Sequence, residues 1–386
     1  MRFPRLFALV AIVVLIPAVA LSGCAGGGGK DKNTLRVGVV TPLTGDVKTF
    51  GESTKNAFLL AMEQAGVTDK GGKIGNVPVE FTIMDDRNDA TEGVNVATKL
   101  ISETKVQAII GSVTSKVTIA ISNVTNPAKV VQVTSTATNP KVTVEDGKRK
   151  AFTFRACFID PFQGTVGAKF ALNNLKAKTA ATLYDQSNDY TVGLAQYFKE
   201  AFEKGGGKVV FEASYGKDDT DFSAVLTKIA GLKPDILYLP DYYQKVSLIG
   251  GQARGKGIKA VFLGGDGWDS SDLDFKAMDG GYFTNHYSSD DPRPEVQTFV
   301  STYKAKYGSV PDALATLAYD ATNMLISAVK STQSNDPEKL REYLASGTFS
   351  AVSGTIKNDA NGDPIKAAVI LQIKDGKQKY VATVNP

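Results

Sequence analysis

The residues best suited to hold a solute are hydroxyl, acidic and aromatic side chains that follow predicted strands. Ser115 opens a predicted helix, whose first backbone N–H groups suit a carboxylate. In the loops that follow later strands, Thr136 and Thr138 add a carbonyl and a hydroxyl, and Asp266, between two glycines, suits an ammonium group. Aromatic residues in the facing loops would enclose an apolar body: Phe50, Tyr190, Tyr242 and Trp268. Together these side chains predict a site for a zwitterion with a side chain, that is, a free amino acid.

Each of these residues also has a purely structural interpretation. Ser115 is a suitable helix N-cap, Asp266 between glycines suits a turn, and Tyr242 or Trp268 could pack between domains. Their joint position at the carboxyl ends of predicted strands, where open α/β sheets bind ligands, favours the binding site.

Residues for catalysis are scarce. His286 is the single histidine of the chain, so it has no second ring for a metal pair, and we expect it to be structural or at the surface. No GxSxG elbow, HExxH or GxGxxG motif occurs. The acidic run 85–89 is interpreted as a strand-end loop that caps a helix, and 269–274 is too irregular for a calcium loop. We therefore expect neither an enzyme nor a metal or cofactor site.

Strands and helices that alternate at a steady period position these loops. Residues 35–41 form a continuous apolar run, which predicts a buried parallel strand. A helical pattern begins at Ser53, and the alternation continues with strands at 77–84, 106–110 and 130–133 and helices at 91–102 and 115–123. This order predicts a parallel sheet with helices on both faces.

The same alternation restarts after 152–155 and predicts a second unit of the same kind. Its strand centres are spaced by 27, 27 and 25 residues, near Leu183, Val210, Leu237 and Phe262. Helical stretches lie at 192–204, 222–232 and 246–256, and later at 295–307, 312–330 and from 337. Asn361-Gly362 predicts a hairpin that joins 354–357 to 365–373, with a last strand at 380–384. The predicted fold class is therefore α/β, with two doubly wound parallel-sheet lobes in tandem.

The N-terminus has the pattern of a bacterial export signal. Arg2 and Arg5 precede an apolar run over 6–20, and the sequence LSGC ending at Cys24 resembles a lipobox, in which the cysteine is lipidated. A glycine run follows, which behaves as a flexible coil. We predict a lipoprotein signal peptide over 1–24, lipidation of Cys24 and a tether over 25–34; a transmembrane anchor is the alternative. The protein would then be extracytoplasmic and anchored to the cell membrane through its lipid.

The charge and cysteine content exclude further classes. The 386 residues carry 44 Lys and Arg against 40 Asp and Glu, and removal of Arg2 and Arg5 leaves 42 against 40, or +2. Nothing in that balance drives binding to nucleic acid. The two cysteines, Cys24 and Cys157, are too few for a disulfide framework or a CxxC metal site.

Motifs along the whole mature chain resemble those of the leucine/isoleucine/valine-binding proteins, the type I solute-binding components of ABC importers. The opening 37–45 reads VGVVTPLTG and is followed by Phe50-Gly51. Further matches are, in chain order, Ile110-Gly111-Ser112 with Ser115, Ala137-Thr138-Asn139-Pro140, Phe154-Arg155 with Asp160 and Gln163-Gly164, Tyr190 with Gly193, Leu263-Gly264 with Gly267, and Ala318-Tyr319. The resemblance implies the type I periplasmic binding protein fold, in which two lobes joined by a three-strand hinge close on the ligand.

The resemblance also implies where the chain crosses between lobes. The crossovers would fall near Cys157, Asn285 and Val352. The predicted N-terminal lobe comprises 35–157 plus 286–352, and the C-terminal lobe 158–285 plus 353–386. The implied partners of this protein, expected to be a monomer, are a small-molecule ligand and the permease and ATPase subunits of an ABC importer.

Roles in the site follow from the resemblance position by position. Ser115 corresponds to the serine that binds the carboxylate, Thr136 to a residue whose carbonyl meets the ammonium, and Thr138 to the threonine that contacts both ends. Asp266 stands where the family has a glutamate that pairs with the ammonium. The predicted ligand-binding set is Phe50, Ser115, Thr136, Ala137, Thr138, Tyr190, Tyr242, Asp266, Trp268 and Tyr319.

The chain departs from the family pattern at several positions. Asn88 and Thr114 occupy the positions of a disulfide in the first lobe, Trp268 replaces a small apolar residue, and Asp266 is a methylene shorter than glutamate. We predict a lipid-anchored receptor of an ABC importer for a neutral amino acid, branched-chain or otherwise hydrophobic. The alternative is the same fold with another small solute, such as an amide, urea or an aromatic acid. A surface hydrolase and the sensor lobe of a receptor are disfavoured.

Overall fold

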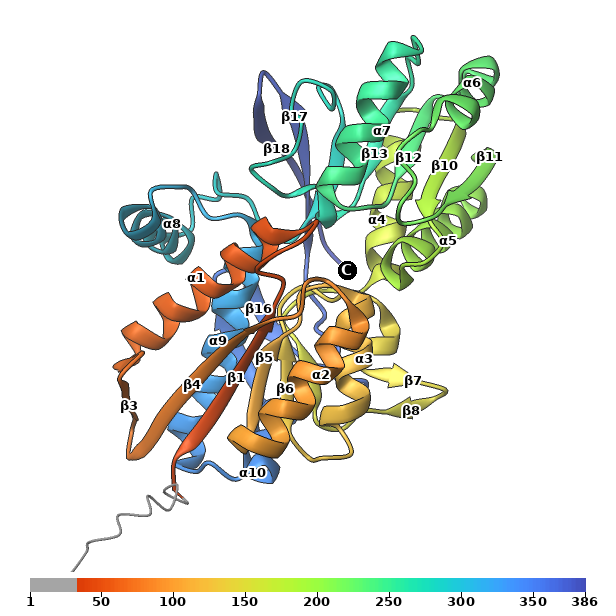
Figure 1. Ribbon diagram of the computed structural model, residues 1–386. Coiled ribbons are helices and arrows are strands. Elements are labelled where there is room, and N and C mark those ends of the chain that lie inside the picture. Colours follow the sequence, from red (N-terminus) through yellow and green to blue (C-terminus); the bar gives the residue numbers. More distant parts are fainter. Residues whose placement is uncertain (1–32) are drawn as a thin grey trace, which may run out of the picture. The chain divides into compact units, whose positions relative to one another are not determined.

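Two seven-stranded sheets organise residues 33–386, the part of the chain that the structure, a computed structural model, describes (Figure 1). The strand order is β2-β3-β4-β1-β5-β6-β9 in the first sheet and β11-β10-β12-β13-β14-β17-β18 in the second. Five adjacent strands of each sheet are parallel. The predicted α/β class with two parallel-sheet lobes is therefore confirmed. The predicted signal peptide and Cys24 lie outside the described residues.

The strands of the first lobe are buried at its centre because helices cover both faces of the sheet. Its strands are β1 (Leu35–Thr41), β2 (Val67–Thr68), β3 (Gly71–Ile74), β4 (Val77–Asp85), β5 (Ala108–Gly111), β6 (Val131–Thr134) and β9 (Thr153–Arg155). Along β1, Val37 and Val39 contact the core under one layer of helices and Val40 contacts the core under the other, as the two-residue period of a strand requires. The first layer contains α1 (Lys48–Gln64), α9 (Ala313–Thr332) and α10 (Pro337–Ser346), and the second contains α2 (Ala90–Lys99) and α3 (Ser115–Thr125).

The second lobe repeats this arrangement. Its strands are β10 (Thr179–Asp185), β11 (Lys208–Tyr215), β12 (Ile236–Leu239), β13 (Val261–Gly264), β14 (Tyr282–Asn285), β17 (Ala368–Lys374) and β18 (Lys377–Val384). One face packs against α4 (Asp160–Asn173) and α5 (Asp189–Lys204), and the other against α6 (Ser223–Leu232) and α7 (Tyr243–Gly255). Helix α4 was not predicted, because Pro161, Gly164 and Gly167 interrupt its apolar pattern. Gly164 allows α5 to approach, since a Cβ there would lie 2.7 Å from the backbone nitrogen of Phe198.

The chain passes between the two sheets three times: after β9, after β14 and after β16 (Gly354–Lys357). Buried charges join the first and third passages. The Arg155 guanidinium lies 2.9 Å from Asp363, and Lys366 Nζ donates to the carbonyl of Ala156 over 3.1 Å. The second passage leads into α8 (Pro294–Tyr307), which packs against α1 and α9. These three passages form the hinge.

The predicted hairpin between 354–357 and 365–373 is wrong. The turn at Asn361-Gly362 does form, and Asp359 accepts hydrogen bonds from Gly362 N and Asp363 N, but the pairing beyond it is limited to the isolated bridge between Asn358 and Pro364 and one bond from Ile365 N to Lys357 O. β16 pairs instead with β15 (Thr348–Ala351), and β17 pairs with β14 and β18 in the second lobe. The ion pair of Asp363 with Arg155 holds this segment in the hinge, and the chain continues from there to β17 in the second sheet.

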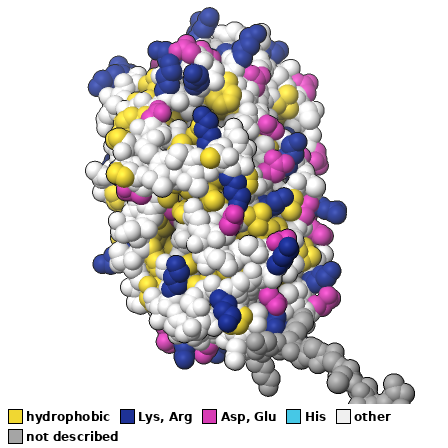
Figure 2. All heavy atoms as spheres, turned by 90° about the vertical axis from the view of Figure 1, so that its left-hand side faces the viewer, with side chains coloured by type: hydrophobic (Ala, Val, Ile, Leu, Met, Phe, Trp, Pro, Cys, Tyr) yellow, Lys and Arg dark blue, Asp and Glu magenta, His cyan; other side chains and the backbone are white. Residues whose placement is uncertain are grey.

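The surface of the described residues is ordinary for a protein of low net charge. Figure 2 shows one face on which Lys and Arg side chains are interspersed with Asp and Glu. Among residues 33–386, no helix combines the length and apolar character needed to cross a membrane.

Candidate functional site

The carboxyl ends of strands from both sheets meet at a narrow cavity. It measures about 20 Å³ and is lined by Phe50, Val113, Thr114, Ser115 and Thr136 of the first lobe, Tyr190, Tyr242, Asp266 and Gly267 of the second, and Leu314 of α9. The structure thus brings together six predicted residues: Phe50, Ser115, Thr136, Tyr190, Tyr242 and Asp266.

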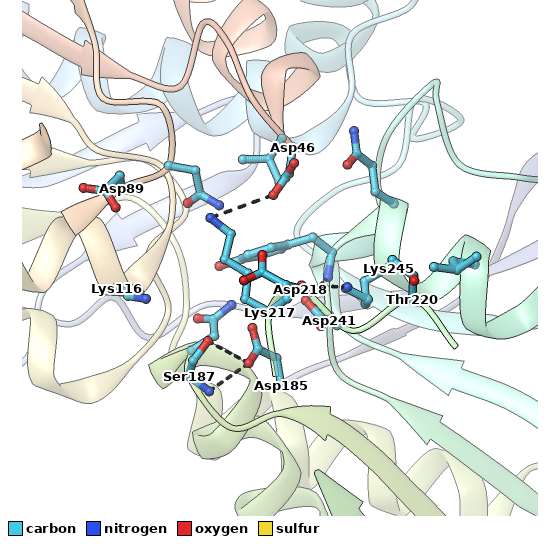
Figure 3. Close-up of a pocket in the computed structure, with 16 residues that line it drawn as sticks. Asp46, Asp89, Lys116, Asp185, Ser187, Lys217, Asp218, Thr220, Asp241 and Lys245 are labelled. Atoms are coloured by element: carbon cyan, nitrogen blue, oxygen red, sulfur yellow. Dashed lines mark hydrogen bonds and ion pairs between the residues drawn. The ribbon is translucent and has the colours of Figure 1, made fainter. Parts of the chain in front are cut away.

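A wider hollow of about 450 Å³ shares Tyr242 with this cavity (Figure 3). Its wall carries charged residues of both lobes, and Asp46 of the first lobe lies 3.9 Å from Lys217 of the second. The narrow cavity and this outer hollow are both lined by residues of the two lobes.

The first lobe presents the N-terminus of α3 to the cavity. The first helical hydrogen bond here is donated by Thr118 N to Thr114 O, so the N–H groups of Ser115 and the next two residues precede the helical ladder. Ser115 Oγ accepts from Asn139 N over 3.2 Å, and Thr136 Oγ1 donates to Val113 O over 2.9 Å, which fixes both hydroxyls. Free N–H groups at the positive end of a helix suit a carboxylate.

The second lobe presents Asp266, which is 5% exposed and opens the 3₁₀ turn η3 (Asp266–Trp268). Its Oδ1 accepts from Gln163 Nε2 and Tyr190 Oη, each over 2.9 Å, and its Oδ2 lies 3.0 Å from His286 Nε2. The glycine before it is needed for this packing, because a Cβ on Gly265 would lie 2.5 Å from Tyr190 Oη. Three hydrogen-bonding groups therefore fix the orientation of the carboxylate in the site.

Aromatic rings from both lobes close the cavity. Tyr190 and Tyr242 are stacked with centroids 5.3 Å apart, and Phe50 meets Tyr242 edge to face at 5.8 Å across the lobes. Burial raises the pKa of Tyr190 and of Tyr242 well above 10, so both keep their hydroxyl protons. These rings supply an apolar wall between the two polar ends.

The structure does not bring four other predicted residues to the cavity. Ala137 and Thr138 lie behind its wall: the carbonyl of Ala137 accepts from Arg155 Nη1 over 2.6 Å, and that of Thr138 accepts from Asp160 N over 3.0 Å. Tyr319 lies within α9, its ring against Phe299 at 4.7 Å. Its hydroxyl bonds to Gln64 on α1 over 2.5 Å.

The fourth residue, Trp268, is fully buried in the second lobe. The η3 turn directs its ring beneath β12 and β13, where Nε1 donates to Leu239 O over 2.9 Å and the ring lies 6.0 Å from Phe283. The absence of a side chain at Gly264 makes room for the indole. The indole of Trp268 therefore belongs to the core of the second lobe and does not line the cavity.

Two neighbours of Asp266 were missed as site residues. His286 was expected to be structural or at the surface, but its side chain is fully buried against Asp266. Its position just after the expected crossover at Asn285 was the available signal. Gln163 was noted only within the motif Gln163-Gly164, and helix α4, which carries it, was not predicted.

A hydrogen bond links the two positions, 88 and 114, at which the resemblance implies a disulfide in the family. Thr114 Oγ1 donates to Asn88 Oδ1 over 2.8 Å, so a hydrogen bond links the two segments. Within residues 33–386, no group of three or more His, Cys, Asp or Glu side chains has the arrangement needed for a metal ion.

A helix N-terminus and a buried acid that line one cavity between two parallel-sheet lobes fit the class of periplasmic solute-binding proteins. The family model for periplasmic binding proteins matches residues 34–378, and the chain belongs to this family.

The similarity to known relatives extends over nearly the whole chain. A leucine-, isoleucine-, valine-, threonine- and alanine-binding protein of Pseudomonas aeruginosa is 28% identical over 94% of this chain and 93% of its own. The crystal structure of a leucine-binding protein of Thermotoga maritima is 37% identical, covers 92% of this chain and 99% of its own, and has a TM-score of 0.85. A solute-binding protein of R. palustris in complex with benzoate shares the fold, with a TM-score of 0.82, 24% identity, and coverage of 92% of this chain and 97% of its own.

Proposed function

We propose that this chain is an extracytoplasmic, lipid-anchored solute-binding protein of an ABC importer, and that it binds a free neutral amino acid, branched-chain or otherwise hydrophobic. The observation that supports the proposal is that the α3 N-terminus, from the first lobe, and Asp266, from the second, line the same cavity. An α-amino acid carries the two complementary charges on adjacent groups.

In the proposed complex each end of the zwitterion has its own partner. The ligand carboxylate accepts hydrogen bonds from the N–H groups of α3 and from Ser115, and the ammonium donates to Asp266. Phe50, Tyr190 and Tyr242 pack against the side chain. No covalent step takes place, so selectivity depends on these contacts alone.

Entry of the ligand requires the lobes to separate. A cavity of about 20 Å³ holds little more than one water molecule. Polar contacts hold the lobes together around it: Asn139 Nδ2 donates to the carbonyl of Asp189 over 2.8 Å, and Lys141 pairs with the Asp189 carboxylate at 3.0 Å. We therefore propose hinge motion between the two lobes, which the chain joins by the three passages after β9, β14 and β16.

The competing proposal is an amide, urea or an aromatic acid in the same cleft. None of these carries an ammonium group, so none would need an ionised Asp266. Support for an aromatic acid comes only from the shared fold of the benzoate complex, whereas the buried acid with three donors favours an amino acid.

Calorimetry of the purified chain against a ligand panel tests the proposal. The panel contains leucine, isoleucine, valine, phenylalanine, glutamate, acetamide, urea and benzoate. We expect one site per chain, with the neutral apolar amino acids first and glutamate last among the amino acids. Tight binding of benzoate, urea or acetamide with no binding of any amino acid would contradict the proposal.

A further inference from the structure

The single histidine of the chain lies directly behind the acid of the proposed site. His286 follows β14 at the second passage of the hinge, and its Nε2 lies 3.0 Å from Asp266 Oδ2. Its ring stacks on Phe158 with centroids 3.8 Å apart, and the residue is 2% exposed. A titratable ring in the hinge is thus in contact with the carboxylate that we assign to the ligand ammonium.

The contacts of the ring define its charge state. A carboxylate only accepts hydrogen bonds, so the proton of a neutral His286 ring sits on Nε2. Nδ1 is buried and has no hydrogen-bond partner within the described residues, so a second proton there would be unsatisfied. Burial lowers the pKa of His286 below its ordinary value of 6.5, although the hydrogen bond and the charge of Asp266 act in the opposite direction.

The charged groups around the ring come from three elements. Asp266 and Asp269 come from the η3 turn, and Lys366 from the third passage of the hinge. Asp160 at the start of α4 feels the charge of Asp266 and is fully buried; burial raises its pKa to about 8, so it is largely uncharged at neutral pH. Of these groups, Asp266 is the one in hydrogen-bond contact with the ring.

We propose that His286 is a positioning residue: as a neutral donor it holds the Asp266 carboxylate toward the ligand, and protonation of its ring lowers the affinity for an amino acid. The inference rests on the proposed function, since it needs a ligand ammonium at Asp266. A protonated ring forms an ion pair with Asp266, and the ammonium then meets a carboxylate whose charge is already neutralised. Because His286 lies on the second passage of the hinge and contacts Asp266, the protonation state of this passage would change when the ligand binds.

Protonation of His286 should change the apparent Kd by an amount that depends on pH in a defined way. If only the form with a neutral ring binds, the apparent Kd equals the intrinsic Kd divided by the fraction of neutral ring, and it rises about tenfold for each pH unit below the ring pKa. Linkage requires the converse, that ligand binding lowers the ring pKa. Both statements have the same sign: acid weakens binding, and the ligand drives the proton off.

NMR on the wild-type protein measures the ring directly. One histidine gives one set of imidazole signals, which can be followed from about pH 8 to about pH 5 without and with saturating L-leucine. We expect a pKa below 6.5 for the chain alone and a lower value with leucine. A ring pKa that leucine leaves unchanged or raises would overturn the proposal.

Calorimetry on variants distinguishes the effect of His286 on the pH dependence of binding from the effects of other groups that titrate in the same pH range. In His286→Gln the amide can donate to Asp266 but cannot take up a proton, so the pH dependence of the leucine Kd should flatten. The matched control is Asp86→Asn: burial raises the pKa of Asp86 to about 6, but Asp86 bonds to Ser112 in the first lobe, so this variant should keep the wild-type slope.

The outcomes distinguish this inference from the proposed function. If leucine binds but His286→Gln keeps the full pH slope, the role of His286 is refuted and the proposed function stands. If no amino acid in the panel binds at any pH, both are refuted. If His286→Gln fails to fold, the two NMR titrations of the wild-type ring decide.

Discussion

Replacement of Asp266 by asparagine removes one charge from the proposed site and changes little else. In Asp266→Asn, Oδ1 still accepts from Gln163 and Tyr190, and the new amide faces His286. The neutral His286 ring can move its proton to Nδ1 and accept from that amide with Nε2, which leaves one buried donor, the Nδ1–H group, without a partner within the described residues. We expect the fold to persist, because an unpaired buried donor costs about 1–3 kcal/mol and Asp266→Asn leaves one such donor, whereas Asp266→Ala leaves three.

The expected loss of affinity follows from the burial of the carboxylate. Asp266 is 5% exposed, and truncation of one partner of a buried, hydrogen-bonded charge pair costs about 2–5 kcal/mol. That range corresponds to an increase in Kd of about 30-fold to several thousand-fold. Asp266→Asn should lie within this range because the charge carries most of the interaction.

Titration calorimetry with L-leucine, combined with thermal unfolding of the same samples, is the assay. The control is Asp272→Asn, which removes one charge from an exposed position six residues further along the chain and should bind within threefold of wild type. If folded Asp266→Asn also bound leucine within threefold of wild type, the assignment of the ammonium to Asp266 would be refuted.

Three further predictions concern other parts of the chain. Cys24→Ala should release the protein from the membrane fraction or leave it unprocessed, and a wild-type protein whose mass includes intact residues 1–24 would argue against the lipid anchor. Trp268→Phe should keep the leucine Kd within threefold but lower the melting temperature, because the indole bonds to Leu239 O in the core and does not line the cavity; a large loss of affinity at unchanged stability would return Trp268 to the site. Because the pKa of Asp160 is raised from 3.8 to about 8, the folded state binds more protons than the unfolded state over that range, and this group lowers stability as pH rises. The melting temperature of Asp160→Asn should therefore rise relative to that of the wild type as the pH is raised from about 4 to about 8. A difference in melting temperature between the two proteins that scanning calorimetry finds independent of pH would count against a buried, protonated Asp160.

Much of the architecture could be predicted because it depends on local patterns. The apolar run 35–41 is β1 with all seven residues buried, and Ser115 does begin α3. The hairpin at Asn361-Gly362 failed because its turn is local while its strands are chosen by tertiary contacts. Arg155, more than 200 residues earlier, holds Asp363, and β14 competes for the following strand.

The site could be predicted where strand ends alone decide its position. Ser115, Thr136 and Asp266 line the cavity because each follows a parallel strand at the same edge of a sheet. Trp268 follows the same strand, but the 3₁₀ turn directs its ring into the core, and sequence does not show such a reversal. His286 was missed because its partner is Asp266, 20 residues away, and a lone histidine has no sequence pattern.

The central claim is that both charged ends of an amino acid are bound, one on α3 and the other on Asp266. It is tested most directly by calorimetric comparison of L-leucine with 4-methylpentanoate, which has the same carbon chain and carboxylate but no ammonium group. We predict that leucine binds to one site per chain and that 4-methylpentanoate binds at least about 30-fold more weakly. Binding of 4-methylpentanoate as tight as that of leucine would contradict the account.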